Sequence, residues 1–399
     1  MTLDHLGIAA APGARELFAR LLGAAPYKIE TVESQGVATV FFGDGGRSGA
    51  APKLELLESV ADGSPIARHL ERRGPGLHHV AFEVADLEAE MERVRALGVR
   101  LLSEAPQPGA DGKRIVFLHP KDTGGVLVEL CQSAPPARET LRAPWRGAEV
   151  VATAWGDAGA PVLLALHGAA GTADQLAALA ARWARDWRVV APDLAGHGRT
   201  ADPGGAPTWD AFADGVEAAL DAFDLGAPAA FGYSLGGAAL LRVATRRPGA
   251  FSRLWLHATG VQWTARHVAA FRPGLDAAAL SERARAALAE AHGDRWERVL
   301  AAMTAFGESL PGAWIPDDEL AAVAAPTHVS VGDADPLFSV ADADALRTAL
   351  GARLSVLPGV THALSSLGDD AFATTVDRSL RSSEALQSAR HRRRTGPTR

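Results

Sequence analysis

The feature that most constrains the fold of this chain is a repeat in its first third. The stretch DHLGIAA near the start resembles HHVAFEV further on, and each is followed by a helical run that contains Glu and Arg and ends in LLGA or ALGV. His5 and His79 lie 74 residues apart, and the same spacing separates Glu55 in KLELLE from Glu129 in VLVELC. Two independent pairs with one offset predict two copies of a single structural unit.

Strand alternation places the repeated His and Glu side chains on one face of each strand. In GLHHVAFEV, successive side chains point to opposite sides, so His79 points away from the apolar stripe that contains His78 and Val80. The other three strand-like runs behave in the same way. We therefore expect the two imidazoles and two carboxylates to face a cleft or water, and we expect His79, not His78, to do chemistry.

Convergence of these four side chains would create a metal site. If the two copies pair so that the polar faces line one concave sheet, the four groups meet. Mixed nitrogen and oxygen donors suit a divalent cation such as Co²⁺, Mn²⁺, Ni²⁺ or Zn²⁺. The sequence therefore predicts a metal site formed by His5, Glu55, His79 and Glu129, while a solvated strand position is an alternative for Glu55.

Residues 3–132 resemble the vicinal oxygen chelate superfamily, whose domains are built from paired βαβββ modules. Within it they are most similar to the methylmalonyl-CoA epimerases, through the stretches DHLGIA, SQGV, DGSPIARHLERRGPGLHHVAFEV, GVRLLSEAPQPGADGKRIVFLHP and GGVLVELCQ. By this resemblance His5, His79 and Glu129 match the metal ligands, and Glu55 matches a further ligand position that holds Glu or Gln. Glyoxalase I has a similar ligand set, but SPIA and FLHPKDTGGVLVEL favour the epimerase.

The chemistry of an epimerase needs such a set. Removal of the weakly acidic proton next to a thioester requires a Lewis acid and a base, and the resemblance implies that Glu129 is the base as well as a ligand. Some bacterial relatives carry a glutamate at the position that aligns with Thr39. This difference leaves glyoxalase-like lyase chemistry, or a non-catalytic binding module, as alternatives for the first segment.

The composition changes near residue 140. All four lysines precede this point and all nine tryptophans follow it. The stretch SAPPARETLRAP between them has three prolines and no apolar period, so we predict a linker over residues 134–144. It would join a first domain of residues 1–133 to a second of residues 145–380. The basic, polar residues 381–399 are expected to form a disordered tail.

Length and charge narrow the class of protein. A chain of 399 residues predicts two domains, and a net charge of −7 gives no reason to expect nucleic-acid binding. The single cysteine, Cys131, excludes an intrachain disulfide and fits a reducing cytoplasm. The start MTLDHLGIAA lacks the features of a signal peptide, and no long apolar run is present. We therefore expect a cytoplasmic protein without a membrane span.

The second segment carries the pattern of a serine nucleophile. Short apolar runs such as PVLLALHG and AAFGYSLGG alternate with helical stretches, which predicts a parallel α/β sheet. GYSLG at residues 232–236 has the form G-x-S-x-G, whose glycines permit the strained turn that exposes Ser234. A serine that only caps the N-terminus of a helix could match the same motif. An Asp and a His that follow Ser234 in that order favour the nucleophile.

Residues 145–370 resemble the α/β-hydrolase fold superfamily. LHGAAG matches its oxyanion loop, PDLAGHGRT its DxxGHG stretch, GYSLGG the nucleophile elbow, VGDADPL the acid loop and GVTHAL the histidine loop. The resemblance implies a catalytic triad of Ser234, Asp335 and His362. Asp333 is the competing acid, and Asp335 fits the pattern of the family better.

The resemblance also implies supporting parts around the nucleophile. Backbone N–H groups of Ala169 and Leu235 would form an oxyanion hole, and His167 would belong to the loop structure. Residues 261–322 interrupt the sheet pattern with helical stretches and occupy the place of the lid of the family. A surface for a partner protein is an alternative for this insertion.

These features predict a bifunctional enzyme with two domains: an α+β domain of paired βαβββ modules, followed by an α/β-hydrolase domain with a helical lid. The first would epimerise methylmalonyl-CoA or a similar 2-substituted acyl-CoA with a divalent metal. The second would hydrolyse an ester or thioester, with carbon–carbon bond hydrolysis as an alternative for the same triad. The expected partners are small molecules, foremost an acyl-CoA thioester, with no nucleic acid and no membrane; a homodimer stays open.

Overall fold

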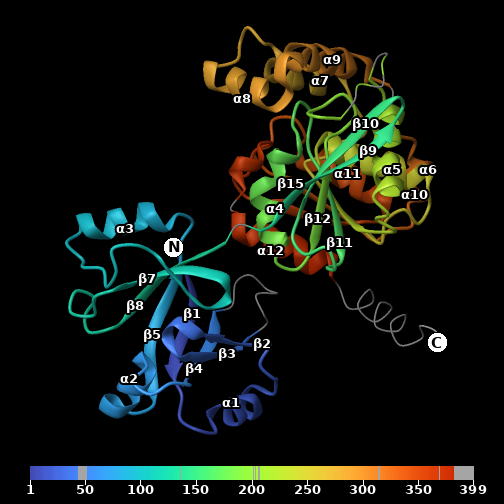
Figure 1. Cartoon of the computed structure of the whole chain (residues 1–399). Coiled ribbons are helices and arrows are strands. Elements are labelled where there is room, and N and C mark those ends of the chain that lie inside the picture. The colour runs from blue at the N-terminus through green and yellow to red at the C-terminus, as the bar shows by residue number, and fades with distance from the viewer. Residues whose placement is uncertain are drawn as a thin grey trace. The chain divides into compact units, whose positions relative to one another are not determined.

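The chain consists of two compact units. The computed structural model describes residues 1–43, 52–134, 136–200, 202, 204, 207–312, 315–367 and 369–381. Contacts divide the chain into Met1–Pro135 and Pro136–Arg399, and each unit contains one eight-stranded sheet (Figure 1). The two units are described separately below.

The first unit contains two copies of the module that the repeat predicts. The first copy consists of β1 (Thr2–Ala9), α1 (Ala14–Leu22), β2 (Lys28–Val32), β3 (Val37–Phe42) and β4 (Lys53–Ser59). The helix α2 (Pro65–Arg73) leads to the second copy, which consists of β5 (Gly76–Glu83), α3 (Leu87–Ala96), β6 (Gln107–Pro108), β7 (Lys113–Leu118) and β8 (Val128–Ser133). The strand order β2-β3-β4-β1-β5-β8-β7-β6 joins the copies through the antiparallel pair β1 and β5. The expected paired βαβββ fold is confirmed.

Side chains alternate along most of β1 and β5, although β1 has register shifts between Leu3 and His5 and between Gly7 and Ile8. The face that carries the histidines is the more deeply buried one. His5 and His79 are 5% and 3% exposed, whereas Ile8 and Val80 on the opposite face are half-buried. The sheet encloses a cavity of about 340 Å³ on the histidine side. The histidines therefore face a cleft, not open water.

The second unit contains a mixed sheet. Its strands are β9 (Arg138–Trp145), β10 (Ala148–Trp155), β11 (Val162–Leu166), β12 (Arg188–Pro192), β13 (Ala229–Tyr233), β14 (Arg253–His257), β15 (Thr327–Gly332) and β16 (Arg353–Leu357). They are arranged in the order β16-β15-β14-β13-β11-β12-β10-β9. The six strands from β16 to β12 are parallel, and β10 and β9 pair antiparallel at one edge. This confirms the predicted α/β sheet.

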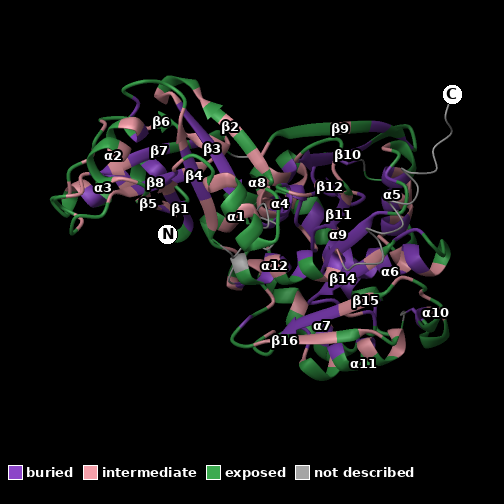
Figure 2. Cartoon of the chain, turned by 90° about the horizontal axis from the view of Figure 1, so that it is seen from below, coloured by how far each residue is buried: buried purple, intermediate pink, exposed green. Residues whose placement is uncertain are grey.

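Helices cover both faces of this sheet. On one face, α4 (Ala177–Trp183) and α12 (Asp369–Leu380) pack around a core that includes Trp183 and Phe231. On the other face lie α5 (Trp209–Ala222), α6 (Leu235–Arg246) and α11 (Val340–Leu350). Residues of β11 alternate between the two cores, as a parallel strand buried on both sides must. Figure 2 shows these central strands buried and β9 largely exposed.

The predicted linker is wrong over most of its length. Residues 138–144 belong to β9, which pairs with β10 from Arg138 opposite Trp155 to Trp145 opposite Ala148. Pro144 is tolerated because β9 is an edge strand, where a missing N–H leaves no ladder partner unpaired. Only a few residues around the boundary at Pro135 connect the units. The predicted tail lies outside the described residues, except for Arg381.

The insertion predicted as a lid is helical. It contains α7 (Ala265–Phe271), α8 (Glu282–His292), α9 (Trp296–Ser309) and α10 (Asp317–Ala321). Figure 1 shows α7, α8 and α9 grouped on one side of the second unit. Among the described residues, no helix combines the length and the apolar character that a bilayer span requires.

Candidate functional site

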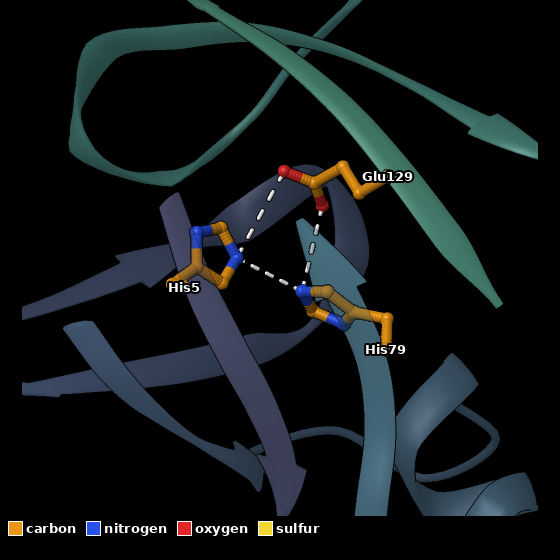
Figure 3. Close-up of side chains that lie close together, drawn as sticks. All are labelled: His5, His79 and Glu129. Atoms are coloured by element: carbon orange, nitrogen blue, oxygen red, sulfur yellow. Dashed lines mark hydrogen bonds and ion pairs between the residues drawn. The ribbon is translucent and has the colours of Figure 1, made fainter. Parts of the chain in front are cut away.

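The side chains predicted to bind metal converge in the cavity of the first unit. His5, His79 and Glu129 lie on the adjacent strands β1, β5 and β8 and point toward one another (Figure 3). One donor atom from each of the three lies within 4.8 Å of those of the others. The Nε2 atoms of the two histidines are 2.9 Å apart, and Glu129 Oε2 lies 3.6 Å from His79 Nε2. This arrangement can hold one cation.

Glu55 joins the same cluster from β4, on the other side of β1. Its Oε2 atom lies 3.3 Å from His5 Nε2 and 3.5 Å from His79 Nε2. Only 4% of Glu55 is exposed, and Glu129 is as buried. The solvated position considered for Glu55 is therefore excluded. Two buried carboxylates beside two imidazoles form the mixed donor set that divalent transition metals accept.

Each histidine of the cluster is oriented by the residue that precedes it. His5 Nδ1 donates to Asp4 Oδ2 at 2.7 Å, and His79 Nδ1 lies 3.0 Å from His78 Nδ1. Because both Nε2 atoms point into the cluster, a ligand histidine carries its proton on Nδ1 and needs an acceptor there. Asp4 and His78 provide the two acceptors. The sequence analysis missed this role, although the two residues share the 74-residue offset of the ligands.

Gly7 makes room for one of the imidazoles. It lies opposite His79 in the register of β1 and β5, and a Cβ atom at Gly7 would come within 2.2 Å of His79 Cε1. The corresponding residue of the second copy, Ala81, lies opposite His5. The two copies therefore differ here, since only the first requires glycine.

Charges in the cluster are strongly coupled. Burial would lower the pKa of His5, but hydrogen bonds with Asp4 and Glu55 raise the pKa of His5 to about 9. Burial raises the pKa of Glu129 to about 8, against the attraction of His5. Burial lowers the pKa of His79 well below its ordinary value, and the neighbouring His5 lowers it further. A divalent cation between these groups would displace the protons that the cluster otherwise shares.

The cavity around the cluster has polar and apolar walls. Thr39, on β3, is 2% exposed, and its hydroxyl donates to the carbonyl of Glu30 at 3.3 Å. Lys113, on β7, donates to Asp4 at 2.6 Å, and Lys53 donates to Asp111 at 2.8 Å. The two lysines are paired with carboxylates, so they make this part of the cavity wall polar without leaving an unpaired cation for a ligand.

In the second unit, Ser234 occupies the sharp turn between β13 and α6. Its backbone has φ 53°, in the left-handed region that side chains other than glycine rarely adopt. The flanking glycines permit close approach: a Cβ atom at Gly236 would lie 2.6 Å from the carbonyl oxygen of His167, and one at Gly232 would lie 2.5 Å from Gly237. The G-x-S-x-G pattern is thus required by the turn.

Ser234, His362 and Asp335 form one hydrogen-bonded chain. Ser234 Oγ lies 3.0 Å from His362 Nε2, and His362 Nδ1 donates to Asp335 Oδ2 at 2.8 Å. The Tyr233 hydroxyl donates to the carbonyl of His362 at 2.8 Å, which fixes the histidine loop against the nucleophile turn. The sequence analysis missed this contact of Tyr233. The arrangement has the geometry of a serine nucleophile with its base and the group that orients the base.

The two candidate acids have different partners. Asp335 Oδ1 accepts from the N–H groups of Leu337 at 2.8 Å and Phe338 at 3.0 Å, so the carboxylate is held in place. Asp333 instead accepts from the N–H of Gly359 at 2.7 Å and ties two loops together. The preference for Asp335 over Asp333 agrees with these contacts.

Ala169 and Leu235 lie beside Ser234 and line the same small cavity. Within the described ranges, neither N–H group of this pair has a hydrogen-bond acceptor. His167 is fully buried, where its Nδ1 donates to the carbonyl of Gly168 and its Nε2 accepts from the N–H of Leu194. His167 is therefore part of the loop structure, as expected.

Comparison with known proteins decides the family of the first domain. A family model described as Glyoxalase/Bleomycin resistance protein/Dioxygenase superfamily matches residues 4–117. The chain is 38% identical to the ethylmalonyl-CoA/methylmalonyl-CoA epimerase of Cereibacter sphaeroides over 134 residues, which cover 33% of this chain and 96% of that protein. The first domain belongs to the methylmalonyl-CoA epimerase family.

Two further relatives match the same part of the chain. Human mitochondrial methylmalonyl-CoA epimerase is 37% identical over 33% of this chain and 73% of that protein. The crystal structure of methylmalonyl-CoA epimerase from Mycobacterium tuberculosis is 39% identical, covers 34% of this chain and 89% of that chain, and has a TM-score of 0.32. These epimerases correspond to the first domain only.

The second domain has the α/β-hydrolase fold. A family model described as alpha/beta hydrolase fold matches residues 161–302, in agreement with the sheet and the Ser234 turn. A thioesterase domain from the curacin biosynthetic pathway is 21% identical, covers 60% of this chain and 99% of that chain, and has a TM-score of 0.49.

Proposed function

We propose that the chain is a bifunctional enzyme. The first domain epimerises methylmalonyl-CoA or a similar 2-substituted acyl-CoA with the help of a divalent cation, and the second hydrolyses an ester or thioester through Ser234. The convergence of His5, His79 and Glu129 carries the first part of the proposal. It occurs in a domain that is 38% identical to a protein named as an epimerase of ethylmalonyl-CoA and methylmalonyl-CoA.

The donor set fits a resident divalent cation. His5, His79 and Glu129 would hold it, with Glu55 beside them, and Asp4 and His78 would keep the two imidazoles in the ligand tautomer. When bound, the cation supplies Lewis-acid stabilisation of the negative charge that develops on the thioester, worth several kcal/mol.

Glu129 is the base in this proposal. Its carboxylate takes the proton from the carbon next to the thioester, and the electron pair of the broken C–H bond is delocalised toward the carbonyl oxygen. Return of a proton to the opposite face gives the other epimer. Thr39 is not the acid that returns this proton, because its hydroxyl donates to the carbonyl of Glu30 and a hydroxyl is a far weaker acid than a carboxyl group.

The epimerase proposal is tested with the two separate epimers. The Co²⁺-loaded chain should convert (2R)- and (2S)-methylmalonyl-CoA into the same mixture, and Glu129→Gln should abolish the conversion. Glu58→Gln, on the same sheet but at a partly exposed position that pairs with Arg15, is the matched control. A folded, metal-loaded protein that leaves both epimers unchanged would contradict the proposal. Turnover of a glutathione hemithioacetal instead would assign glyoxalase-like chemistry.

In the hydrolase proposal, Ser234 Oγ attacks the carbonyl carbon of the substrate as its proton moves to His362 Nε2. Asp335 accepts from His362 Nδ1 and stabilises the imidazolium. The N–H groups of Ala169 and Leu235 donate to the oxyanion. Collapse breaks the bond to the alkoxide or thiolate, which leaves with the proton from His362. A water molecule then repeats the sequence and releases the acid.

Two reagents test the hydrolase independently of the first domain. A fluorophosphonate probe should label Ser234, and a short p-nitrophenyl ester should be hydrolysed. Absence of labelling in the folded wild-type chain would contradict the assignment of the nucleophile.

A further inference from the structure

The cavity at Ser234 differs in chemistry from the cavity of the first unit. Every residue that lines it is apolar except Ser234 itself, and its volume is only about 10 Å³. Five of the lining residues are aromatic: Trp209, Trp263, Phe271, Phe306 and Phe338. A space of this size holds roughly one water molecule, so an acyl group attached to Ser234 would have to displace the lining aromatic side chains and would lie against them.

The rings pack in two groups, Trp209 with Phe306 and Trp263 with Phe271 and Phe338, and together they form an aromatic wall around the cavity. Ring centroids are 4.9 Å apart for Trp209 and Phe306, 5.3 Å for Trp263 and Phe271, and 5.6 Å for Trp263 and Phe338. The indole N–H of Trp263 donates to the carbonyl of Gly260, so this polar atom is already used within the protein. The wall offers an acyl group apolar contact and no hydrogen bond from Trp263.

Two arginines of the helical insertion, Arg266 and Arg272, are paired with carboxylates outside the cavity. Arg266, on α7, donates to Asp342 Oδ2 at 2.6 Å and reaches the carbonyl of Leu337. It is not among the residues that line the cavity. Arg272, at the end of the same helix, faces Glu308 at 3.7 Å. Neither guanidinium is placed to neutralise a carboxylate beside Ser234.

We propose that the acyl group accepted by Ser234 is uncharged, and that acyl groups bearing a carboxylate are excluded. The inference rests on the proposed hydrolase function and names its substrate class. Moving a carboxylate from water into an apolar site without a partner is strongly unfavourable. The second domain therefore does not hydrolyse the methylmalonyl thioester proposed for the first domain, and the two domains act on different acyl groups.

Isobutyryl-CoA and methylmalonyl-CoA form a matched pair of substrates for the test. Isobutyryl-CoA has a methyl group at the position where methylmalonyl-CoA has a carboxylate, and the two compounds are otherwise the same. With the full chain, followed as release of free thiol, kcat/KM should favour isobutyryl-CoA by about 100-fold or more, because the carboxylate would be left unpaired in the site. The methyl ester of the methylmalonyl group removes the charge and adds only one methyl group. Its thioester should be cleaved at a rate close to that of isobutyryl-CoA.

Two variants of one lining residue separate charge from packing. Phe271→Arg adds a cation to the wall and should reduce the ratio of kcat/KM for isobutyryl-CoA to that for methylmalonyl-CoA about tenfold. Phe271→Leu should leave this ratio unchanged. Fluorophosphonate labelling reports whether the site is intact in each.

Two results would overturn the inference in different ways. Hydrolysis of methylmalonyl-CoA within a few-fold of isobutyryl-CoA, lost in Ser234→Ala, would overturn the acyl-group proposal alone. Failure to cleave any thioester or p-nitrophenyl ester, together with absent labelling, would overturn the hydrolase assignment and this inference with it.

Discussion

The two candidate sites hold their side chains in different ways. In the first domain, four side chains project from the strands β1, β4, β5 and β8 of one sheet into a cavity of about 340 Å³. In the second, three side chains follow the strands β13, β15 and β16 on separate loops, beside a cavity of about 10 Å³. The first site gathers buried charges, and the second gathers aromatic rings.

This difference determines whether each site needs an added cation. In the first site, buried groups of like charge lie close together, and the carboxylates and imidazoles share protons. A bound cation would compensate the negative charge of the carboxylates and displace these protons. The chain of Ser234, His362 and Asp335 is complete in hydrogen bonds without any added group. We therefore expect the first activity, but not the second, to depend on metal.

The largest expected effect comes from Ser234→Ala. It removes the nucleophile, so ester hydrolysis should fall about 10⁴-fold or more, and fluorophosphonate labelling should disappear. The metal content of the first domain should stay the same, because the sites share no residue. Ser252→Ala, at an exposed position of the same domain, is the control. Residual hydrolysis near the wild-type rate would place the nucleophile elsewhere.

His79→Ala should have the next largest effect, confined to the first domain. It removes one of the two imidazoles of the cluster, so the purified protein should lose its stoichiometric metal while ester hydrolysis is unchanged. Metal content measured by elemental analysis checks this. Retention of the metal in His79→Ala, with loss in His78→Leu, would reverse the assignment of the two faces of β5.

His78 should have a smaller effect, through the orientation of His79. His78→Leu removes the acceptor of the His79 Nδ1 proton, so metal affinity should fall about 10- to 100-fold. His78→Asn offers an oxygen acceptor and should recover most of the loss. His69→Leu is a control for packing, because the ring of His69 contacts His78 but is not the acceptor of the His79 proton. Competition with a coloured chelator measures the affinities; equal losses in the Leu and Asn variants of His78 would make its role one of packing only.

Much of both sites could be predicted from the sequence, for physical reasons that differ. Strand alternation and the shared offset place His5, Glu55, His79 and Glu129 on one face, because the side-chain period of a strand is fixed. The order of Ser234 and the two later residues follows from the strand order of the fold. The orientation of the ligand histidines by Asp4 and His78 depends on side-chain rotamers, which the sequence pattern does not determine.

The linker prediction failed because local composition and pairing disagree. Three prolines and an exposed, polar stretch favour a connection without structure. Residues 138–144 nevertheless form an edge strand, because β10 offers a ladder and an edge position tolerates both polar side chains and Pro144. Tertiary pairing, which is not local, decides such segments.

The smallest expected effect concerns this strand. A fragment of residues 136–399 should unfold cooperatively on its own, whereas one of residues 143–399 should melt about 5 °C lower. The shorter fragment loses most of the β9 ladder and the guanidinium of Arg138, which lies over the ring of Trp155 at 5.5 Å. Calorimetry compares the two. Equal melting temperatures would show that β9 adds nothing to the stability of the second domain.

The most direct test of the account measures both activities in one metal-depleted sample. After chelation and removal of the chelator, conversion of (2R)- to (2S)-methylmalonyl-CoA should fall about 100-fold or more, and hydrolysis of a p-nitrophenyl ester should be unchanged. Added Co²⁺ or Mn²⁺ should restore the conversion. Full epimerisation by protein shown to be free of metal would contradict the account.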